Sequence, residues 1–590
     1  MTVPETPPAM RKEQVRPARR AGSARGRIPA WLRAAPPSLQ GLLALALYLA
    51  GWILAVAAPL VAHPGSPQLD QASMDPNFYT WNLRWWPYAI GHGLNPLHTT
   101  LIGVPHGFTL AWVTTVPPLA LLASPITLTA GPVVSFNLLA AAALPASAWM
   151  AFLLCRRLTG RLWPSLAGGA VYGFSAYQIN HEVAGQLNLT WSLLLPLMAY
   201  LVVAWRDGSI GRRALVCLLA LAMTAQFYLF LETFADMTVV WAVALLAGYL
   251  VAGRAGRAAV AQLSRLAGAA YLVTLVLVGP YLWYAVTHVP KGFSRSPASA
   301  GLDLSSLIVP RPTQTFGLGW LTSQAAGLPV PSLDGYVGIP LLVLAVALAV
   351  TAWSRRMVRF LTVMLIVLMV FSLGPVVTLG RRRLVSLPWA HLWYLPIVRS
   401  AYPVRFMVFA FLALAVAVSI WLASAPVRAW ARWLLGVLAV AVVLANVPAL
   451  PLAHQPGLPS FITTGEYRRY LSPGEVVVVV SGRGNAGMLW QAQTGFYTRL
   501  AGGYVNRAIV RRTDLPQPVA SLASGLNPVL VVQFRQFLVR ARVGAILVEQ
   551  RWAQGWPRIF ATLGLHGVRV GGVIVYRRRL RSFRTPGGAS

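Results

Sequence analysis

Long apolar runs alternate with short polar segments along most of this chain. A helix needs roughly 20 apolar residues to cross a bilayer, and many segments meet this requirement. The pattern therefore predicts an α-helical polytopic membrane protein with about eleven transmembrane helices. The predicted spans are, in chain order, about 40–62, 133–154, 163–179, 189–205, 214–231, 237–253, 266–287, 336–353, 357–379, 404–424 and 431–450.

A further apolar stretch, about 110–130, contains Pro117, Pro118 and Pro125. Proline interrupts the hydrogen-bond ladder inside a helix. The pattern alone leaves a twelfth span open here. We expect a re-entrant or interfacial piece instead, because the basic loops described below stay on one side of the membrane only if one span lies between His63 and Arg156.

The pattern changes after the last predicted span. The segments "GEVVVVVSG" (474–482), "VGAILVEQ" (543–550) and "GVRVGGVIVY" (567–576) are rich in Val and Ile and bounded by glycine, which is typical of strands. The segment "NPVLVVQFRQFLVRAR" (527–542) has a helical pattern. We therefore predict a small α/β domain over residues 451–590, after a transmembrane domain over 39–450.

The net charge of +35 comes almost entirely from arginine, and most arginines lie in short loops between apolar segments. Such loops stay in the cytoplasm and contact anionic lipid, so we do not expect nucleic-acid binding. The basic tail, residues 1–38, is predicted to be disordered and cytoplasmic. The same rule places the first outer loop, 63–132, and residues 451–590 outside the cell. The basic loops that fix this topology are 155–161, 205–213, 253–265, 354–359 and 427–432.

The motifs of several enzyme classes are missing. The chain has no H-E-x-x-H, G-x-S-x-G, Walker A or C-x-x-C sequence, which removes support for a zinc protease, a serine hydrolase of that type or an ATP-driven pump. A formal G-x-G-x-x-G follows a strand at Gly482–Gly487, but it lacks the acidic partner of a dinucleotide site. We interpret it as a glycine turn. Cys155 and Cys217 lie in or beside apolar segments and indicate no disulfide framework.

The acidic residues are few and unevenly placed. Only fourteen occur in 590 residues, and seven of them map to the outer ends of spans or to outer loops between spans in the predicted topology. Because acids have little influence on helix orientation, this distribution indicates chemistry or binding at the outer face. These outer acids are Asp70, Asp75, Glu182, Glu232, Asp236, Asp303 and Asp334.

Asp75 opens the aromatic stretch "MDPNFYTWNLRWWPYAIGHGLNP". Asp followed by Pro can cap and start a helix, and this structural role is one interpretation. The other is a carboxylate held at the outer membrane surface as a general base, which needs hydrogen-bond reach to a hydroxyl group.

A first span, a long outer loop with an early Asp, an interfacial piece, many further spans and an outer C-terminal domain together resemble the GT-C superfamily of membrane glycosyltransferases. The pieces "GYVGIPLLVLAVALAV" (335–350) and "LPIVRSAYPVRF" (395–406) are also similar to bacterial membrane proteins of this kind. The resemblance implies that Asp75 is the catalytic base and that the donor is a polyprenyl-phosphate sugar. Asp70 stands five residues away rather than adjacent, so a divalent metal ion is left open.

The other candidate substrate-binding residues are polar or charged side chains at the same outer side: Asp70, His181, Glu182, Asn188, Glu232, Arg399 and Arg405. Arg399 and Arg405 are predicted on the outer side, against the positive-inside trend. One interpretation is phosphate binding, because an arginine can bind phosphate with two parallel hydrogen bonds. The alternative is that they anchor the chain at the membrane–water interface.

We therefore expect an inverting glycosyltransferase of the bacterial inner membrane. It would transfer a sugar from a polyprenyl-phosphate donor to a glycan, lipid or protein acceptor of the cell envelope. The alternatives are a lipid or glycolipid transporter and an assembly scaffold. Paired repeats and broken helices are typical of transporters, and no repeat is evident in this sequence.

Overall fold

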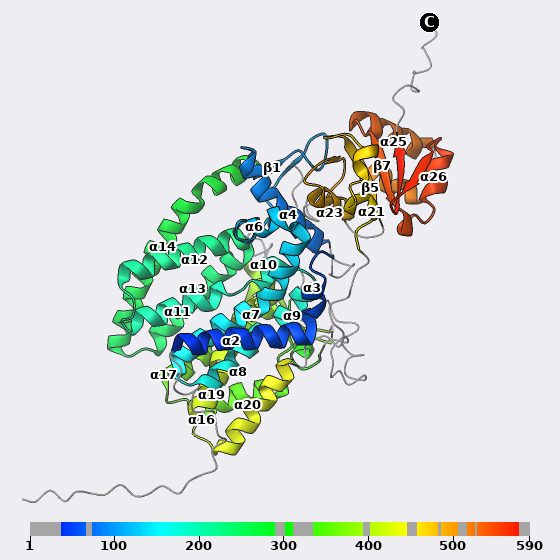
Figure 1. Ribbon diagram of the computed structural model, residues 1–590. Coiled ribbons are helices and arrows are strands. Elements are labelled where there is room, and N and C mark those ends of the chain that lie inside the picture. Colours follow the sequence, from blue (N-terminus) through cyan, green and yellow to red (C-terminus); the bar gives the residue numbers. More distant parts are fainter. Residues whose placement is uncertain are drawn as a thin grey trace, which may run out of the picture.

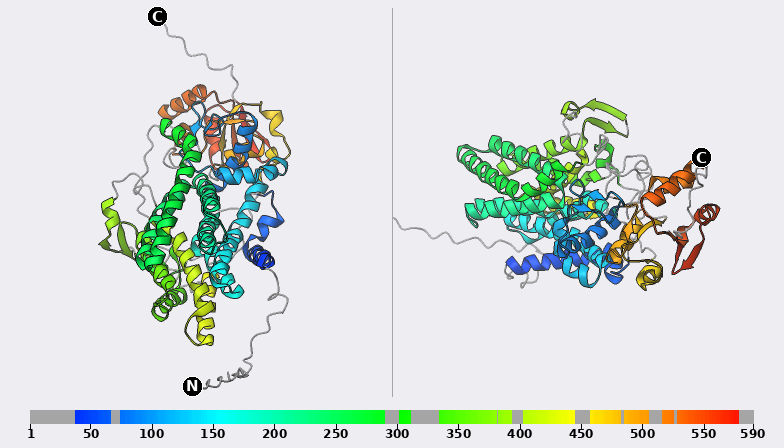
Figure 2. Two further views of the ribbon diagram at one scale, coloured as in Figure 1. Left: turned by 90° about the vertical axis from the view of Figure 1, so that its left-hand side faces the viewer. Right: turned by 90° about the horizontal axis from the view of Figure 1, so that it is seen from above.

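The computed structural model describes a helical body joined at one end to a mixed α/β region (Figures 1 and 2). The structure describes residues 37–66, 74–289, 301–310, 334–380, 382–392, 402–444, 457–481, 485–504, 516–524 and 528–577.

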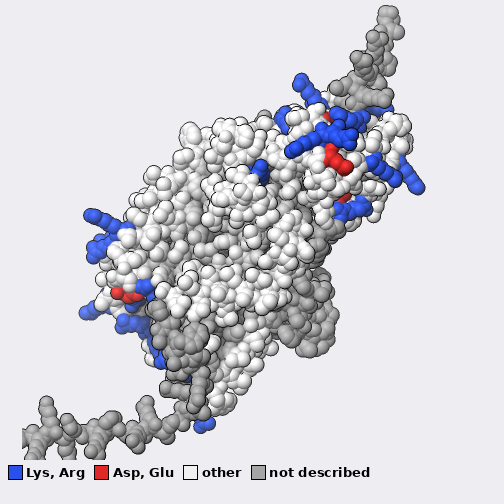
Figure 3. All heavy atoms as spheres, viewed as in Figure 1, with Lys and Arg blue, Asp and Glu red and all other residues white. Residues whose placement is uncertain are grey.

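Eight helical segments of the described residues are long and apolar enough to cross a membrane. In the view of Figure 3, a broad band that is nearly free of charged side chains separates basic groups at the two ends. This arrangement is what a bilayer requires, because charges at the centre of a membrane are costly. The eight segments are Ser38–Ala62 (α2, η1 and α3), Pro132–Thr159 (α7), Leu187–Arg206 (α10 and α11), Arg212–Leu229 (α12), Leu231–Val251 (α13), Arg254–Thr287 (α14), Arg356–Leu373 (α17) and Pro403–Ser424 (η5 and α19).

Three of the eleven predicted spans correspond to shorter helices: α8 (Leu162–Gly173), α16 (Ile339–Thr351) and α20 (Ala429–Leu444). The predicted span 163–179 breaks at Phe174. Ser175 then caps a new helix, α9 (Ala176–Val183), by accepting a hydrogen bond from the Gln178 amide. Apolar content alone did not reveal this break, which separates an apolar segment from a polar one.

The proline-rich stretch 110–130 forms two short helices, α5 (Pro117–Leu122) and α6 (Ser124–Thr129). Each is about 9 Å long at 1.5 Å per residue, so neither can cross a bilayer. Both pack on α4 (Asp75–Gly91), the helix that begins at the predicted Asp-Pro start. The N-cap of α4 is Met74, so Asp75 is the first helical residue and not the cap.

The predicted strands are present in a five-stranded mixed sheet with the order β6-β5-β7-β9-β8. The β5, β6 and β7 strands are parallel, whereas β9 runs antiparallel to both β7 and β8. Residues on β5 alternate between two apolar clusters, one shared with α4 and one shared with α25 and α26. The strands are β5 (Val476–Val480), β6 (Arg499–Leu500), β7 (Ala545–Glu549), β8 (Gly567–Val570) and β9 (Val573–Arg577).

The sheet region is tied to the first outer loop by backbone hydrogen bonds along the free edge of β6. The Leu500 amide donates to the Leu101 carbonyl, and the Val104 amide donates to the Leu500 carbonyl. The Gly103 amide donates in turn to Gly502. Residues 101–104 therefore extend the sheet at its edge, so the first loop and the C-terminal region share one core.

The remaining elements are short. They are β1 (His98–Thr99), β2 (Phe108–Thr109), η2 (Leu304–Leu307), β3 (Val376–Leu379), β4 (Arg382–Ser386), η4 (Pro388–Leu392), α21 (Ser460–Thr463), α22 (Tyr467–Tyr470), α23 (Ala486–Gln493), α24 (Gln517–Ala520), η6 (Ser521–Ser524), α25 (Pro528–Arg540), η7 (Gln550–Trp552) and α26 (Trp556–Thr562).

Candidate functional site

Asp75 lies half-buried in the first turn of α4. Its Oδ2 accepts a hydrogen bond of 2.7 Å from Nε2 of Gln186, which precedes α10. The negative charge of Asp75 also lies near the positive end of the α4 dipole, which stabilises an anion there. The carboxylate is therefore held by contacts with both its own helix and a second segment.

The Gln186 amide connects Asp75 to a histidine. Because Nε2 of Gln186 donates to Asp75, its Oε1 is the atom that faces His181, 2.6 Å from the ring Nδ1. The other ring nitrogen, Nε2, lies 3.4 Å from Oδ2 of Asp334. The ring of His181 thus lies between the side chains of Gln186 and Asp334, and its contact with Asp334 is an ion pair when the ring is protonated.

Asp334 receives a second contact at its other oxygen, because Nδ2 of Asn180 donates to Oδ1 at 3.0 Å. Asp334 is 5% exposed, so its charge needs these partners. The result is a polar chain from Asp75 through Gln186 and His181 to Asp334, in which the last link is a contact of 3.4 Å and not a hydrogen bond.

Tyr79 follows Asp75 by one helical turn and faces the same side of α4. Its hydroxyl donates to Oδ1 of Asn188 at 2.6 Å. Burial raises the pKa of Tyr79, the charge of Asp75 raises it further, and the charge of Arg405 lowers it. The hydroxyl is therefore protonated and lies within electrostatic range of both charges.

Arg405 forms an ion pair with Glu232, which also accepts a hydrogen bond of 2.9 Å from the Tyr402 amide. The guanidinium group lies over the rings of Phe230 and Tyr402, at 4.9 Å and 4.5 Å from their centroids. Cation–π contact and the ion pair together hold the buried charge. The guanidinium still has more N–H donors than one carboxylate can use.

Two further acids are buried with an oxygen that has no hydrogen-bond partner in the described part of the chain: Oδ2 of Asp236 and Oε1 of Glu182. Asp236 lies one turn after Glu232 on α13 and therefore on the same helix face. Glu182 is 1% exposed, and burial raises its pKa. It is adjacent to His181 in the sequence, but consecutive residues of a helix point in different directions.

The structure brings together most of the residues predicted from sequence. Asp75 and His181 share the Gln186 amide, Asn188 binds Tyr79, and Glu232 pairs with Arg405. Two predicted residues, Asp70 and Arg399, and the glycine turn at 482–484 lie outside the described residues.

Sequence reasoning missed Gln186, Tyr79 and Asp334 as members of the site. Two signals were available. Gln186 lies in the same polar string, "YQINHEVAGQLN", as His181, and Tyr79 lies four residues after Asp75.

The described residues do not form a recognisable metal site. Among them, no group of three or more His, Cys, Asp or Glu side chains could hold a metal ion. Asp75 instead binds an amide N–H. The chemistry available in this part of the chain is that of a carboxylate acceptor, an imidazole, a phenol and a paired guanidinium group.

The C-terminal region positions the start of α4. Nδ2 of Asn485 donates to the Met74 carbonyl at 2.9 Å, and Nε1 of Trp81 donates to Oε1 of Gln491 at 2.7 Å. Asn485 is fully buried and adopts a left-handed backbone conformation with φ of 48°, which Asn tolerates better than most residues. Asn485 therefore acts on Asp75 through the backbone of the preceding residue.

Asn485→Asp is expected to loosen this attachment. The variant keeps the shape and the backbone preference of Asn485 but replaces the N–H donor with a carboxylate oxygen that faces the Met74 carbonyl. The Met74 carbonyl then keeps only the Phe78 amide as its donor, and the lost hydrogen bond costs about 0.5–1.5 kcal/mol before the repulsion between the two oxygens is added. Backbone amides in the first turns of α4 should therefore exchange with solvent roughly tenfold faster or more, measured by hydrogen–deuterium exchange. Asn485→Gly, which allows the same φ, should behave similarly. Unchanged exchange in both variants would refute the positioning role.

Comparison with solved structures identifies the fold. Similar structures include the arabinofuranosyltransferase AftD from Mycobacteria (13% identity, TM-score 0.54), covering 92% of this chain and 40% of that chain. Another is ArnT from Cupriavidus metallidurans bound to undecaprenyl phosphate (13% identity, TM-score 0.51), covering 94% and 100%. A third is the oligosaccharyltransferase AglB from Archaeoglobus fulgidus with an inhibitory peptide and a dolichol-phosphate (11% identity, TM-score 0.50), covering 94% and 76%.

All three belong to the GT-C superfamily, so the resemblance seen in the sequence is confirmed and the chain has a GT-C fold. The chain spans less than half the length of AftD. A family model described as "Domain of unknown function (DUF6311)" matches residues 41–445. No curated protein sequence matches the chain.

Proposed function

Because the chain belongs to the DUF6311 family and folds as GT-C membrane glycosyltransferases do, we propose that it is an inverting glycosyltransferase. Its donor is a sugar linked to a polyprenyl phosphate, and its acceptor is a hydroxyl-bearing glycan, lipid or protein of the cell envelope. The observation that carries the proposal is the hydrogen-bonded carboxylate of Asp75 in the first turn of α4.

In the proposed reaction, Asp75 removes the proton from an acceptor hydroxyl group. The acceptor oxygen attacks the anomeric carbon of the donor sugar from the side opposite the phosphate. The new glycosidic bond forms as the bond between that carbon and the phosphate oxygen breaks, so the configuration inverts. The polyprenyl phosphate leaves with the bonding electrons, and Asp75 holds the proton until water accepts it.

The polar chain from Gln186 to Asp334 orients the base in this proposal. The hydrogen bond from Gln186 to Oδ2 fixes the orientation of the Asp75 carboxylate. His181 in turn fixes the Gln186 side chain, whose Oε1 lies 2.6 Å from the ring Nδ1. His181 and Asp334 thus act through Gln186, as positioning residues.

Arg405 stabilises the leaving phosphate in this proposal. The Glu232 pair fixes the guanidinium group in a buried position, and the N–H donors that Glu232 does not use can bind a phosphate oxygen. A preorganised cation near the leaving group lowers the barrier as negative charge develops there.

The direct experiment uses the full chain in liposomes, with polyprenyl-phosphate sugars and acceptors added on the side of the sheet region. The proposal expects release of polyprenyl phosphate that depends on the acceptor. Movement of an intact donor across the bilayer, without such release, would refute transfer and favour a lipid transporter.

We further propose that the protein lies in the bacterial inner membrane with its N-terminus in the cytoplasm and residues 451–590 outside. Single cysteines at residues 208 and 520, in a background without Cys155 and Cys217, test this topology with membrane-impermeant maleimide on intact cells. Residue 520 is expected to react and residue 208 to react only after lysis. Labelling of both from one side would overturn the topology.

A further inference from the structure

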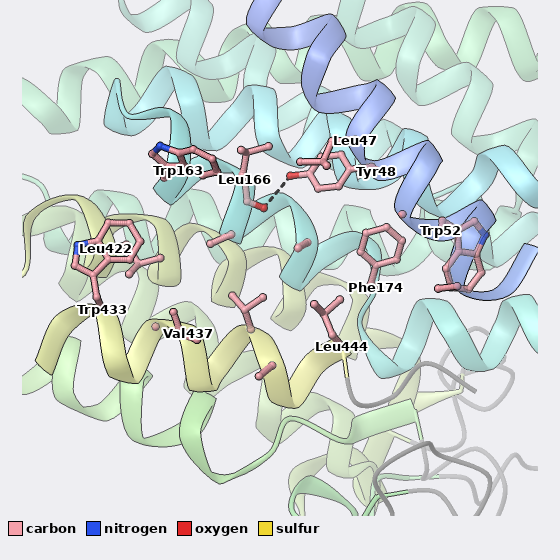
Figure 4. A pocket seen from close by; sticks show the side chains of 17 residues that line it. Leu47, Tyr48, Trp52, Trp163, Leu166, Phe174, Leu422, Trp433, Val437 and Leu444 are labelled. Carbon is pink, nitrogen blue, oxygen red and sulfur yellow. Dashed lines mark hydrogen bonds between the residues drawn. The ribbon is translucent and has the colours of Figure 1, made fainter. Parts of the chain in front are cut away.

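An apolar groove of about 880 Å³ lies between α2, α8 and α20 (Figure 4), and none of the residues that line it belongs to the Asp75 site. Small residues form much of its wall, among them Gly51, Ala55, Ala167, Ala170 and Ala441. The hydroxyl of Tyr48, which also lines it, already donates to the Leu166 carbonyl at 2.8 Å. A ligand in the groove would therefore meet mainly apolar surface, because the Tyr48 hydroxyl already donates its hydrogen bond to the protein.

The two ends of the groove differ. Trp163 and Trp433 line one end, and Trp side chains favour the boundary between membrane and water. At that same end, the exposed Arg161 directly precedes α8, and the exposed Arg428 directly precedes α20. This end thus combines aromatic rings with two positive charges.

Aromatic rings close the opposite end. The ring of Phe174 lies 5.7 Å from that of Trp52 and 6.0 Å from that of Tyr48, measured between centroids. Phe174 also ends α8, just before the polar helix α9 that carries His181. A chain that enters between the two tryptophans therefore stops before it reaches the candidate site.

The length of the groove matches one leaflet. Trp163 and Phe174 are eleven residues apart, as are Trp433 and Leu444, which corresponds to about 16 Å along a helix. The hydrocarbon core of a bilayer is about 30 Å thick, so the groove covers about half of it. A long polyprenyl chain would exceed this length, and its phosphate would have to lie at the end away from Asp75.

We propose that this groove binds an anionic glycerophospholipid from the leaflet on the side of Arg161 and Arg428. One acyl chain occupies the groove, ends against Phe174, and fills the space between α2 and α20. The phosphate lies over the two arginines, which bind phosphate oxygens by charge-assisted hydrogen bonds.

A groove-filling substitution tests the proposal. A Cβ atom added at Gly51 would meet no heavy atom within 4 Å, so the larger side chain of Gly51→Leu can extend into the groove that Gly51 lines. The matched control is Gly279→Leu on α14, which also has open space and does not line the groove. Ala55→Leu is a second groove-filling variant if Gly51→Leu yields no folded protein.

The full-length protein is reconstituted with equal amounts of phosphatidylglycerol, phosphatidylcholine and undecaprenyl phosphate, purified again, and analysed for retained lipid by native mass spectrometry. We expect the unaltered protein and Gly279→Leu to retain one phosphatidylglycerol. Gly51→Leu should retain at least tenfold less. Arg161→Gln with Arg428→Gln should lose the preference for phosphatidylglycerol over phosphatidylcholine.

Two results would overturn the proposal. One is equal retention of phosphatidylglycerol by Gly51→Leu and the unaltered protein. The other is selective retention of undecaprenyl phosphate that Gly51→Leu abolishes, which would make the groove a donor site. Crosslinking tests the orientation of the acyl chain. Phosphatidylglycerol with a photoreactive group at the chain terminus should label the peptide around Phe174 or Leu444. Labelling at Trp163 or Trp433 instead would contradict the proposed orientation.

Discussion

Asp75→Asn is expected to lower sugar transfer by roughly 10²–10⁴-fold, the usual cost of losing a general base. An Asn side chain has nearly the same shape and can still accept the hydrogen bond from Gln186, but it cannot take a proton from an acceptor hydroxyl. Because Met74 and not Asp75 is the N-cap of α4, the structural cost is limited to the lost dipole interaction, about 0.3–1 kcal/mol. The measurement is the rate of polyprenyl-phosphate release by the purified variant.

Asp207→Asn is the matched control for this experiment. Asp207 is an exposed acid at the far end of α11, where its ion pair with Arg157 lowers its pKa. Exposed ion pairs contribute little to stability because water screens them, so this variant should fold and transfer sugar as the unaltered protein does. A folded Asp75→Asn variant with full activity would end the assignment of Asp75 as the base. The remaining role of Asp75 would then be to place a negative charge at the start of α4.

Glu232→Gln is expected to destabilise the protein by about 3–5 kcal/mol, because it leaves the buried Arg405 charge without its main partner. The side chains of Glu232 and Arg405 are only 9% and 16% exposed, so water cannot replace the lost carboxylate effectively. Chemical or thermal unfolding in detergent micelles measures the effect. This cost arises because removing one partner leaves an uncompensated buried charge. The net contribution of the intact ion pair to stability can be much smaller.

The double variant Glu232→Gln with Arg405→Met separates these two quantities. It removes both charges and should recover most of the lost stability, since an apolar replacement of a buried pair is often nearly neutral. Its transfer activity should stay low, because the proposed phosphate ligand is gone. If Glu232→Gln and the unaltered protein have the same stability against unfolding, the ion pair with Glu232 is not the interaction that stabilises the Arg405 charge. Asp236 or another group would then compensate that charge.

The parts of the fold that could be predicted from sequence are those with strong local patterns. Apolar runs gave the membrane helices, Val-rich segments gave β5, β7 and β9, and Asp75-Pro76 gave the start of α4. The break at Phe174 was missed, because the apolar run continues through Gly173 and Phe174 and an isolated glycine does not by itself end a helix. The attachment of residues 101–104 to β6 has no local signal at all, since edge pairing depends on backbone groups that every residue carries.

The candidate site shows the same division. Charged residues stand out in an acid-poor chain, so Asp75, Glu232 and Arg405 were found individually. Their partners were not found, because Gln186 lies 111 residues from Asp75 and Arg405 lies 173 residues from Glu232. Such contacts depend on how the helices turn and pack. A nearly all-apolar helix such as α19 carries little periodicity from which its orientation could be deduced.

The hydrogen bonds from Asn485 and Trp81 have a consequence for biosynthesis. Their partners lie 411 and 410 residues apart in the chain, and at about 5–20 residues per second a ribosome needs about 20–80 s to cover that distance. During this interval the aromatic helix α4 has been synthesised without the sheet region against which it packs, while the later apolar helices are still being made. The start of α4, with the Asp75 carboxylate, therefore gains its last contacts only after residue 485 has been made, so the candidate site is not complete in a shorter nascent chain.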